Sequence, residues 1–252
     1  MVNNNNFVNK EDLKRLNFIL DTITEYLVMK GDILDCGCGT GIVAKEVGKL
    51  GHQVIGIDDD HATIEFAKSG NLQENVNFIE IDATGYYNEE NCFDAIICSE
   101  VLEHLPNPNS LIQLVFKILK ANGVFIVTVP NGKGPRELFV TRPILWLRKH
   151  GGIAWKLILK IKQVLGYNGK SVQSKAENMD HLHFFTMKDL KKIADNNGFK
   201  IVKLKKTNFI SGVFPLSLIT RHSTHLQAFD CWIAEKLPYS FSSGFLTIWI
   251  KK

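Results

Sequence analysis

The stretch ILDCGCGTG, residues 33–41, joins a run of strand-forming residues to three glycines that alternate with other residues. Gly37, Gly39 and Gly41 would let the backbone turn tightly at the exit of the strand and let a ligand approach the main chain closely. The helix expected at 42–50 would point its first N–H groups toward the same place. We therefore expect a strand–turn–helix unit that holds a ligand at the end of its strand.

The alternation of strands and helices continues on both sides of this turn. A helix is predicted at 11–29, where apolar residues recur at helical spacing. Strands that alternate with helices are typical of a parallel sheet covered on both faces. The predicted strands are 32–38, 53–58, 75–82, 92–99 and 123–130, and the predicted helices between them are 42–50, 62–69 and 110–120.

The rhythm changes after Gly132. An apolar helix with lysines on one side is predicted at 153–165, followed by a loop at 166–178. Thr186 is the expected N-cap of a helix at 186–198 that Gly198 ends. Strands are predicted at 199–206 and 244–252, with an apolar stretch at 207–243 between them. Most aromatic side chains of this half are expected in the core: Trp155, Phe184, Phe185, Phe209, Phe214, Phe229 and Trp232.

The composition indicates an ordinary globular chain. The 252 residues are 45% apolar and 22% charged, which suits one large domain. The N-terminus lacks the apolar core of a signal peptide, and the longest apolar run, 209–220, is too short to span a membrane. The five cysteines have no metal or redox spacing, so a reducing, cytoplasmic setting is expected.

Charge is distributed unevenly along the chain. Residues 133–206 hold 17 Lys and Arg against 5 Asp and Glu, although the whole chain carries a net charge of only +4. A basic half beside an acidic half favours an anionic partner for the second half, although a merely solvated surface would give the same pattern.

Asp58 indicates what the glycine turn binds. It ends the second predicted strand, 17 residues after Gly41, where a carboxylate can accept both hydroxyls of a ribose. It would also suit the cap of the helix that follows. A dinucleotide fold requires G-x-G-x-x-G, and Ile42 stands where the third glycine belongs. The sequence also lacks a P-loop motif, which argues against a nucleoside triphosphate. A nucleoside ligand that is neither NAD nor a nucleoside triphosphate is therefore favoured.

At this point the chain resembles the class I S-adenosylmethionine-dependent methyltransferases. The segments that carry the resemblance follow one another in family order between residues 31 and 132: DILDCGCGTG, VIGIDDD, NFIEIDAT, FDAIICSEVLEHL and GVFIVTVPNG. The resemblance implies an α/β fold, a seven-stranded Rossmann-like sheet that is mostly parallel with an antiparallel last strand, plus a helical cap. It also implies S-adenosyl-L-methionine as the cofactor.

The resemblance divides the chain into four parts. Residues 1–30 would form an N-terminal helix, 31–132 the cofactor-binding core, 133–185 a substrate cap, and 186–252 the part that completes the sheet, with an apolar insertion at 207–243. The HFFT motif, residues 183–186, is similar to that of ubiquinone-type, glycan and secondary-metabolite methyltransferases.

The resemblance also implies roles for single residues. Asp35, Gly37 and Gly39 would line the methionine end of the cofactor, and Asp58 would hold its ribose. Asp82 and Ala83 would lie at the adenine, and Ser99 and Glu100 would form the floor near the sulfonium. Cys38 and Asp59 adjoin these residues and are counted with them, although Asp59 and Asp60 are also typical helix caps.

His104 is the candidate general base. Methyl transfer from a sulfonium is an in-line displacement that needs no acid, so catalysis is mostly positioning. A base is needed where the nucleophile is a hydroxyl, and histidine suits that work. His104 follows the fourth strand in SEVLEHLPNP, where a parallel sheet places its site. The alternative is that His104 braces the loop before Pro106.

A metal site is the second reading of the same segment. Glu100, Glu103 and His104 lie at i, i+3 and i+4, one face of a helical turn. A similar pattern in small-RNA 2′-O-methyltransferases and ubiquinone-type O-methyltransferases resembles a divalent-cation site. His181 would be the fourth ligand, or else His183. Because metal-independent members carry the same pattern, a metal is not favoured.

The main hypothesis is O-methylation of a small molecule, sugar or lipid-linked intermediate. This acceptor would be anionic if the basic half of the chain contacts it. Nucleic acid is not favoured, because no RNA-binding module accompanies the basic charge. The predicted helix at 153–165 is expected to be a lid packed on the sheet, with peripheral contact with a membrane surface as the alternative. The alternatives are a metal-dependent enzyme, including one acting on RNA 2′-hydroxyls, and a non-catalytic cofactor-binding regulator. The oligomeric state is not determined by the sequence.

Overall fold

The computed structural model describes residues 10–86, 90–152, 160, 181–213, 216–220 and 223–252. Its centre is a seven-stranded sheet in the order β3-β2-β1-β4-β5-β7-β6. The strands are β1 (Asp32–Cys36), β2 (Gln53–Asp58), β3 (Val76–Glu80), β4 (Phe93–Ser99), β5 (Leu119–Pro130), β6 (Phe199–Lys206) and β7 (Gly244–Lys251).

The first five strands run parallel, and β7 runs antiparallel to both of its neighbours, β5 and β6. This is the predicted fold class, with the antiparallel last strand where the sequence placed it. The register aligns Cys36 with Ile57 and with Cys98, and Asp58 with Glu80. The carboxyl ends of four parallel strands therefore form one edge of the sheet.

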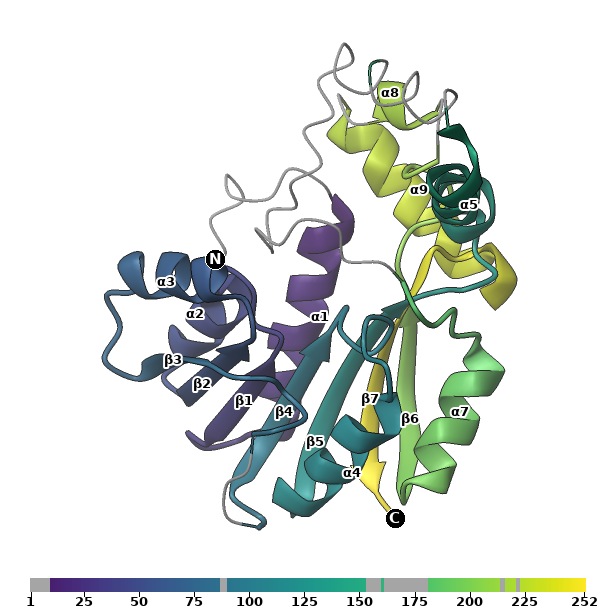
Figure 1. Cartoon of the computed structure of the whole chain (residues 1–252). Coiled ribbons are helices and arrows are strands. Elements are labelled where there is room, and N and C mark those ends of the chain that lie inside the picture. The colour runs from purple at the N-terminus through teal and green to yellow at the C-terminus, as the bar shows by residue number, and fades with distance from the viewer. Residues whose placement is uncertain (1–9, 87–89, 153–159, 161–180, 214–215, 221–222) are drawn as a thin grey trace.

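Helices cover both faces of the sheet (Figure 1). On one face, α1 (Lys10–Tyr26), α2 (Ile42–Gly48) and α3 (His61–Ser69) pack against one set of alternate strand side chains. On the other face, α4 (Pro108–Ile118) and α7 (Met187–Asn196) pack against the opposite set. The central strands β1, β4 and β5 therefore bury both of their faces, as their apolar sequences require, whereas the edge strand β3 leaves alternate side chains exposed.

The predicted elements of the core are present with small shifts at their ends. β2 and β6 begin and end as predicted, and α7 begins with a complete capping box between Thr186 and Asp189. α1 ends at Tyr26 rather than at Met29, and Met29 is exposed. The predicted helix at 153–165 and loop at 166–178 lie outside the described residues, apart from Lys160.

A helical cap stands over the carboxyl ends of the strands (Figure 1). Its elements follow β5 and β6 in the chain: a π-helical turn (Glu137–Thr141), α5 (Arg142–His150), α8 (Leu216–Thr220), α9 (Thr224–Lys236) and a 3₁₀ turn (Tyr239–Phe241). Ser223 caps α9 by accepting a hydrogen bond from the backbone N–H of Leu226. The expectation that most aromatic residues of this half are in the core is wrong for Phe229 and Trp232, which are 57% and 58% exposed.

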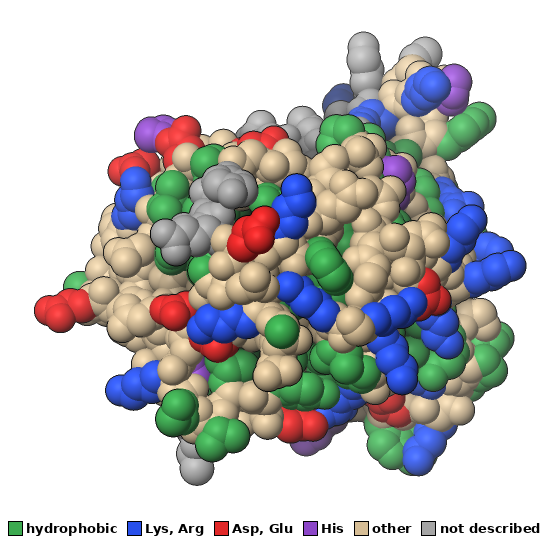
Figure 2. All heavy atoms as spheres, turned by 90° about the horizontal axis from the view of Figure 1, so that it is seen from below, with side chains coloured by type: hydrophobic (Ala, Val, Ile, Leu, Met, Phe, Trp, Pro, Cys, Tyr) green, Lys and Arg blue, Asp and Glu red, His purple; other side chains and the backbone are tan. Residues whose placement is uncertain are grey.

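Lysine and arginine side chains gather on one side of the molecule. In the view from below, they are concentrated on the right, the side on which β6 and α7 lie (Figure 2). β6 and α7 contribute seven of the lysines in the basic half of the chain. Among the described residues, none of the helices is both long enough and apolar enough to cross a membrane.

Candidate active site

The glycine turn brings the main chain close to the end of β4. Gly37, Gly39 and Gly41 all have positive φ, at 67°, 53° and 76°, which residues with a Cβ adopt with strain. A Cβ on Gly37 would also lie 2.3 Å from Cγ2 of Val101. The turn therefore requires glycine for its backbone conformation, and at Gly37 for its packing as well.

Asp35 lies under this turn with an unsatisfied oxygen. The side chain is 2% exposed, and its Oδ2 has no hydrogen-bond partner among the described residues. Burial, with a smaller contribution from the nearby charge of Asp58, raises the pKa of Asp35 to about 8. A buried polar atom without a partner points to a ligand group that completes it. The small cavity above it is lined by Asp35, Gly37, Cys38, Thr40, Ile42, Val43 and Ser99.

Asp58 is tied to the glycine turn. Its Oδ2 accepts a hydrogen bond of 2.9 Å from the backbone N–H of Gly39, and its Oδ1 accepts one of 3.1 Å from that of Asp60. Burial raises the pKa of Asp58. The N-cap of α3 is Asp60, whose side chain accepts from Thr63, as expected for one of the two aspartates. Asp59 is exposed and is not that cap.

Asp82 and Ala83 follow β3 at the same edge of the sheet. Asp82 is exposed, and its Oδ1 accepts hydrogen bonds of 2.6 Å from both the N–H and the hydroxyl of Thr84. These bonds lower its pKa. Ala83 is partly buried against the core. The two residues bound the edge on the β3 side, opposite Ser99 and Glu100 at the end of β4.

Glu100 has an unusual backbone conformation and a fixed carboxylate. Its φ is +59°, which is uncommon for a residue other than glycine. Its backbone N–H donates to the carbonyl of Thr128, and its Oε1 accepts from the hydroxyl of Thr128 at 3.0 Å. Its Oε2 lies 3.2 Å from the guanidinium of Arg15 on α1. Ser99 shares the Thr128 hydroxyl at 3.0 Å.

Glu103, His104 and His181 form a cluster beside Glu100. One ligand atom from each of the three lies within 4.8 Å of those of the other two. Nε2 of His104 lies 3.8 Å from Oε1 of Glu103. The imidazole rings of His104 and His181 meet edge to face, with 5.0 Å between the ring centroids. The segment before α7 is held here because the N–H groups of Leu182 and His183 both donate to the carbonyl of Glu103. The cluster unites the predicted His104 with the predicted His181 but does not include Glu100.

Electrostatics set the charge of this cluster. Glu103 is 1% exposed and accepts no side-chain hydrogen bond from the described residues, and burial, together with the charge of Glu100, raises its pKa well above its usual range. Burial and the neighbouring His181 lower the pKa of His104 to about 4. His104 is therefore neutral at neutral pH, with an imidazole nitrogen that can accept a proton or bind a cation.

The geometry agrees with the comparison of the chain with known protein families. Residues 9–204 match the family model described as "Methyltransferase domain". The chain belongs to this methyltransferase family. This agrees with the resemblance to the class I S-adenosylmethionine-dependent methyltransferases found in the sequence, which implies S-adenosyl-L-methionine as the cofactor.

Curated relatives of this methyltransferase include two named as ubiquinone biosynthesis O-methyltransferases. The mitochondrial protein of Rattus norvegicus is 30% identical over 159 residues, which is 57% of this chain and 45% of that protein. The protein of Shewanella halifaxensis is 35% identical over 119 residues, 46% of this chain and 50% of that protein. The matched segment thus spans about half the length of each relative.

Solved structures share the fold across nearly the whole chain. A magnesium protoporphyrin IX methyltransferase from Synechocystis PCC 6803 with bound S-adenosylhomocysteine has a TM-score of 0.59 at 14% identity, covering 96% of this chain and 84% of that one. A methyltransferase from Archaeoglobus fulgidus, described as dependent on S-adenosylmethionine, has a TM-score of 0.59 at 18% identity, covering 96% and 95%. At these identities the likeness concerns the fold.

The residues of the methyltransferase at the sheet edge fit this cofactor. The unsatisfied oxygen of Asp35 can receive a cationic ammonium group, and the positive-φ glycines leave backbone without side chains beside it. Asp58 at the end of β2 stands where a ribose diol would meet a carboxylate.

Three residues near the site were not predicted from the sequence. Arg15 contacts Glu100 from α1, Thr128 contacts it from β5, and Glu137 lies 3.3 Å from Nδ1 of His181. Glu137 is 1% exposed and also accepts from the hydroxyl of Thr141. For Arg15 the available signal was a charged residue on the apolar side of a predicted helix, next to Leu16 and Ile19.

Proposed function

We propose that this methyltransferase O-methylates a hydroxyl of a small molecule, a sugar or a lipid-linked intermediate, with His104 as the general base. The observation that carries the proposal is the cluster of His104, His181 and Glu103 at the end of β4, next to the candidate cofactor residues. The names of the two relatives, both O-methyltransferases, support oxygen as the acceptor atom.

The residues divide the work of this reaction. S-adenosyl-L-methionine, when bound, supplies a sulfonium methyl group for in-line displacement. We assign its methionine end to Asp35, Gly37, Cys38 and Gly39, its ribose to Asp58 with Asp59 beside it, its adenine to Asp82 and Ala83, and the floor to Ser99 and Glu100. Burial and the neighbouring His181 lower the pKa of His104 to about 4. The imidazole is therefore uncharged at neutral pH, which is the form in which a general base accepts a proton, although this pKa lies below the near-neutral value at which a base is most effective.

We assign acceptor recognition to residues 133–185 and 207–243. Their described parts form the cap over the carboxyl ends of the strands, and the cap contributes Glu137 and His181 to the surroundings of His104 (Figure 1). Basic residues of α5 support an anionic acceptor, and exposed aromatic residues of the cap support a lipid-linked acceptor taken from a membrane surface.

The described cysteines are all free, which supports the cytoplasmic setting.

Replacement of His104 tests the base assignment. His104→Ala is expected to lower turnover by about 10²–10⁴, because proton transfer would then depend on water. Binding of S-adenosylhomocysteine, measured by calorimetry, is expected to stay close to that of the wild type, since His104 is not assigned to the cofactor. His183→Ala is a matched control, because His183 lies in the same segment as His181 but outside the cluster. Wild-type turnover in the His104 variant would refute the assignment.

A metal-dependent version is the second candidate, and the same cluster favours it. Glu103 presents two buried oxygens without hydrogen-bond partners among the described residues, facing two histidines. Glu103, His104 and His181 would hold a divalent cation, which lowers the pKa of a hydroxyl bound to it. Glu100, the further ligand considered from the sequence, would remain with Arg15 and Thr128.

A chelator distinguishes the two candidates. If a cation is required, prolonged treatment with EDTA followed by its removal is expected to abolish turnover, and added Mg²⁺ or Mn²⁺ to restore it. The base mechanism instead predicts that turnover is indifferent to the chelator. Glu103→Gln provides a second arm, because it removes the charge that a cation requires while keeping the shape of the side chain. Full activity of metal-free protein would exclude the metal-dependent version.

A further inference from the structure

Arg15 is the one charged residue among the buried residues of α1, which are otherwise Leu16, Phe18, Ile19, Thr22 and Ile23. It is 5% exposed and lies between Leu16 and the polar N-terminal turn of α1. Arginine is seldom buried unless it is paired. Its guanidinium lies 3.0 Å from Asp12 on the same helix and 3.2 Å from Glu100 at the end of β4. Arg15 thus links the N-terminal helix to the floor of the proposed cofactor site.

The Glu100 that Arg15 contacts is held in a conformation that it would not adopt alone. A φ of +59° is strained for a glutamate and persists where surrounding contacts determine it. Two of those contacts come from Thr128 on β5, one to the backbone N–H and one to the carboxylate. Arg15 supplies the remaining contact that the described residues make with the other carboxylate oxygen.

The neighbouring Glu103 has no equivalent of Arg15 at hydrogen-bond distance. Its oxygens accept no hydrogen bond from the described residues and face the imidazoles of His104 and His181. Glu100 and Glu103 therefore differ in what holds them, although they are three residues apart. The acidic attraction of Glu100 and Asp12 outweighs the cost of burial at Arg15 and raises its pKa, so its charge persists.

We propose that Arg15 is a positioning residue for cofactor binding, which holds the Glu100 carboxylate at the floor of the cofactor site and apart from the Glu103–His104–His181 cluster. The proposal rests on the proposed role of Glu100 as a cofactor contact. Arg15 acts through Glu100 rather than by touching the cofactor. A double-mutant cycle separates such an indirect effect from two independent ones.

The experiment measures the dissociation constant of S-adenosylhomocysteine by calorimetry for the whole chain and its variants. Arg15→Met is expected to weaken binding by about tenfold, because the two contacts from Thr128 would no longer be sufficient to hold Glu100. Glu100→Gln is expected to weaken it by a similar factor. In the Glu100→Gln background, Arg15→Met is expected to add less than about twofold, because Arg15 would no longer have a carboxylate to position.

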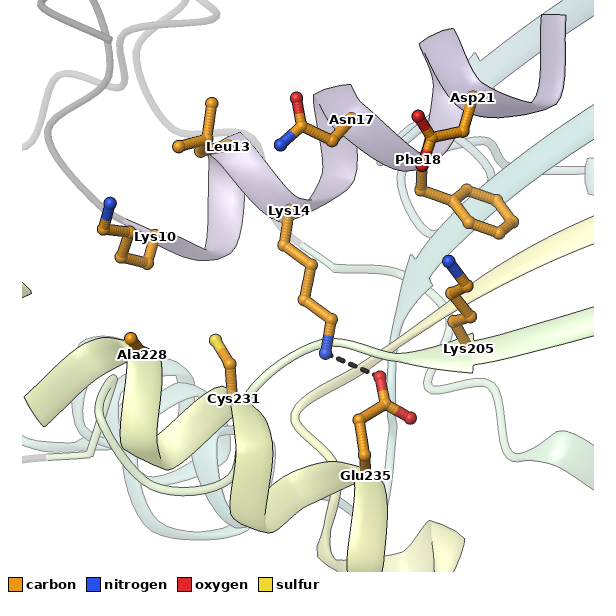
Figure 3. A pocket seen from close by; sticks show the side chains of 10 residues that line it. All are labelled: Lys10, Leu13, Lys14, Asn17, Phe18, Asp21, Lys205, Ala228, Cys231 and Glu235. Atoms are coloured by element: carbon orange, nitrogen blue, oxygen red, sulfur yellow. Dashed lines mark hydrogen bonds and ion pairs between the residues drawn. The ribbon is translucent and has the colours of Figure 1, made fainter. Parts of the chain in front are cut away.

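Lys14→Met is the matched control on the same helix. Lys14 is the residue before Arg15, and its ammonium points across a groove to Glu235 on α9, 2.7 Å away (Figure 3). The residues that line this groove include none of those assigned to the cofactor. Loss of this ion pair is expected to leave the dissociation constant within about twofold of the wild-type value.

Arg15→Lys is a second variant for the case in which Arg15→Met does not fold. It keeps the positive charge in place of the guanidinium fork, and it is expected to bind S-adenosylhomocysteine more tightly than Arg15→Met. Wild-type affinity in folded Arg15→Met, an affinity of Arg15→Lys no tighter than that of Arg15→Met, or effects of Arg15→Met and Glu100→Gln that simply add, would overturn the positioning role. Failure of the wild-type protein to bind S-adenosylhomocysteine would instead overturn the proposed site as a whole.

Discussion

At the scale of the residue, the sequence predicts those site residues that lie close to one another along the chain. The positive φ of Gly37 and Gly39 and the place of Asp58 follow from residues within 25 positions of one another. Arg15, Thr128 and Glu137 were not predicted, because their partners lie far along the chain and only the folded sheet brings them together. A short motif encodes a turn, whereas an ion pair between distant elements leaves almost no local signal.

Asp35 carries a prediction about stability and pH. Its pKa is raised to about 8, above its ordinary value of 3.8, because burial disfavours the carboxylate. In that interval the folded protein binds a proton that the unfolded chain has lost, so stability falls as the pH rises. Asp35→Asn removes this charge while keeping the size of the side chain. The melting temperature of the variant, relative to wild type, is therefore expected to be higher at about pH 9 than at about pH 5.

Asp82→Asn is the control for that measurement. The hydrogen bonds from Thr84 lower the pKa of Asp82, so its contribution to stability is already complete above its ordinary pKa. Its replacement is expected to change the melting temperature by the same amount at both pH values. A difference between Asp35→Asn and wild type that does not vary with pH, measured by calorimetry without cofactor, would contradict a buried, proton-binding Asp35.

At the scale of the element, strands and helices of the core could be predicted because burial imposes a period on each of them. The cap was harder, and α9 illustrates the reason. It exposes Phe229 and Trp232, so its apolar residues do not mark a single buried stripe. What fixes it is partly distant: the carboxylate of its Asp230 accepts hydrogen bonds from the backbone N–H groups of residues 209–211. These bonds satisfy the backbone N–H groups of a loop whose sequence shows only apolar residues and gives no sign of this partner.

At the scale of the whole molecule, the sheet and the cap divide function between them. The strand ends hold residues suited to the cofactor, and the cap lies over those ends and reaches the candidate base through Glu137 and His181. The cap also carries exposed aromatic residues that a water-facing surface does not require, among them Phe139 at 69% and Trp146 at 62%. Arg148 and Lys149 lie in the same helix as Trp146.

This arrangement predicts contact with anionic membranes, as a lipid-linked acceptor would require. The protein is expected to co-sediment with vesicles that contain phosphatidylglycerol, and less so as salt is raised, because the basic contribution is screened. Phe139→Ala with Trp146→Ala is expected to weaken this binding by about tenfold, since partial burial of two aromatic rings is worth on the order of 1–3 kcal/mol. Leu72→Ala is the control, because Leu72 is 97% exposed but lies in the loop that leads into the opposite end of β3. Equal binding by the cap variant and the control, or no binding to anionic vesicles at low salt, would show that these aromatic residues serve something other than a membrane.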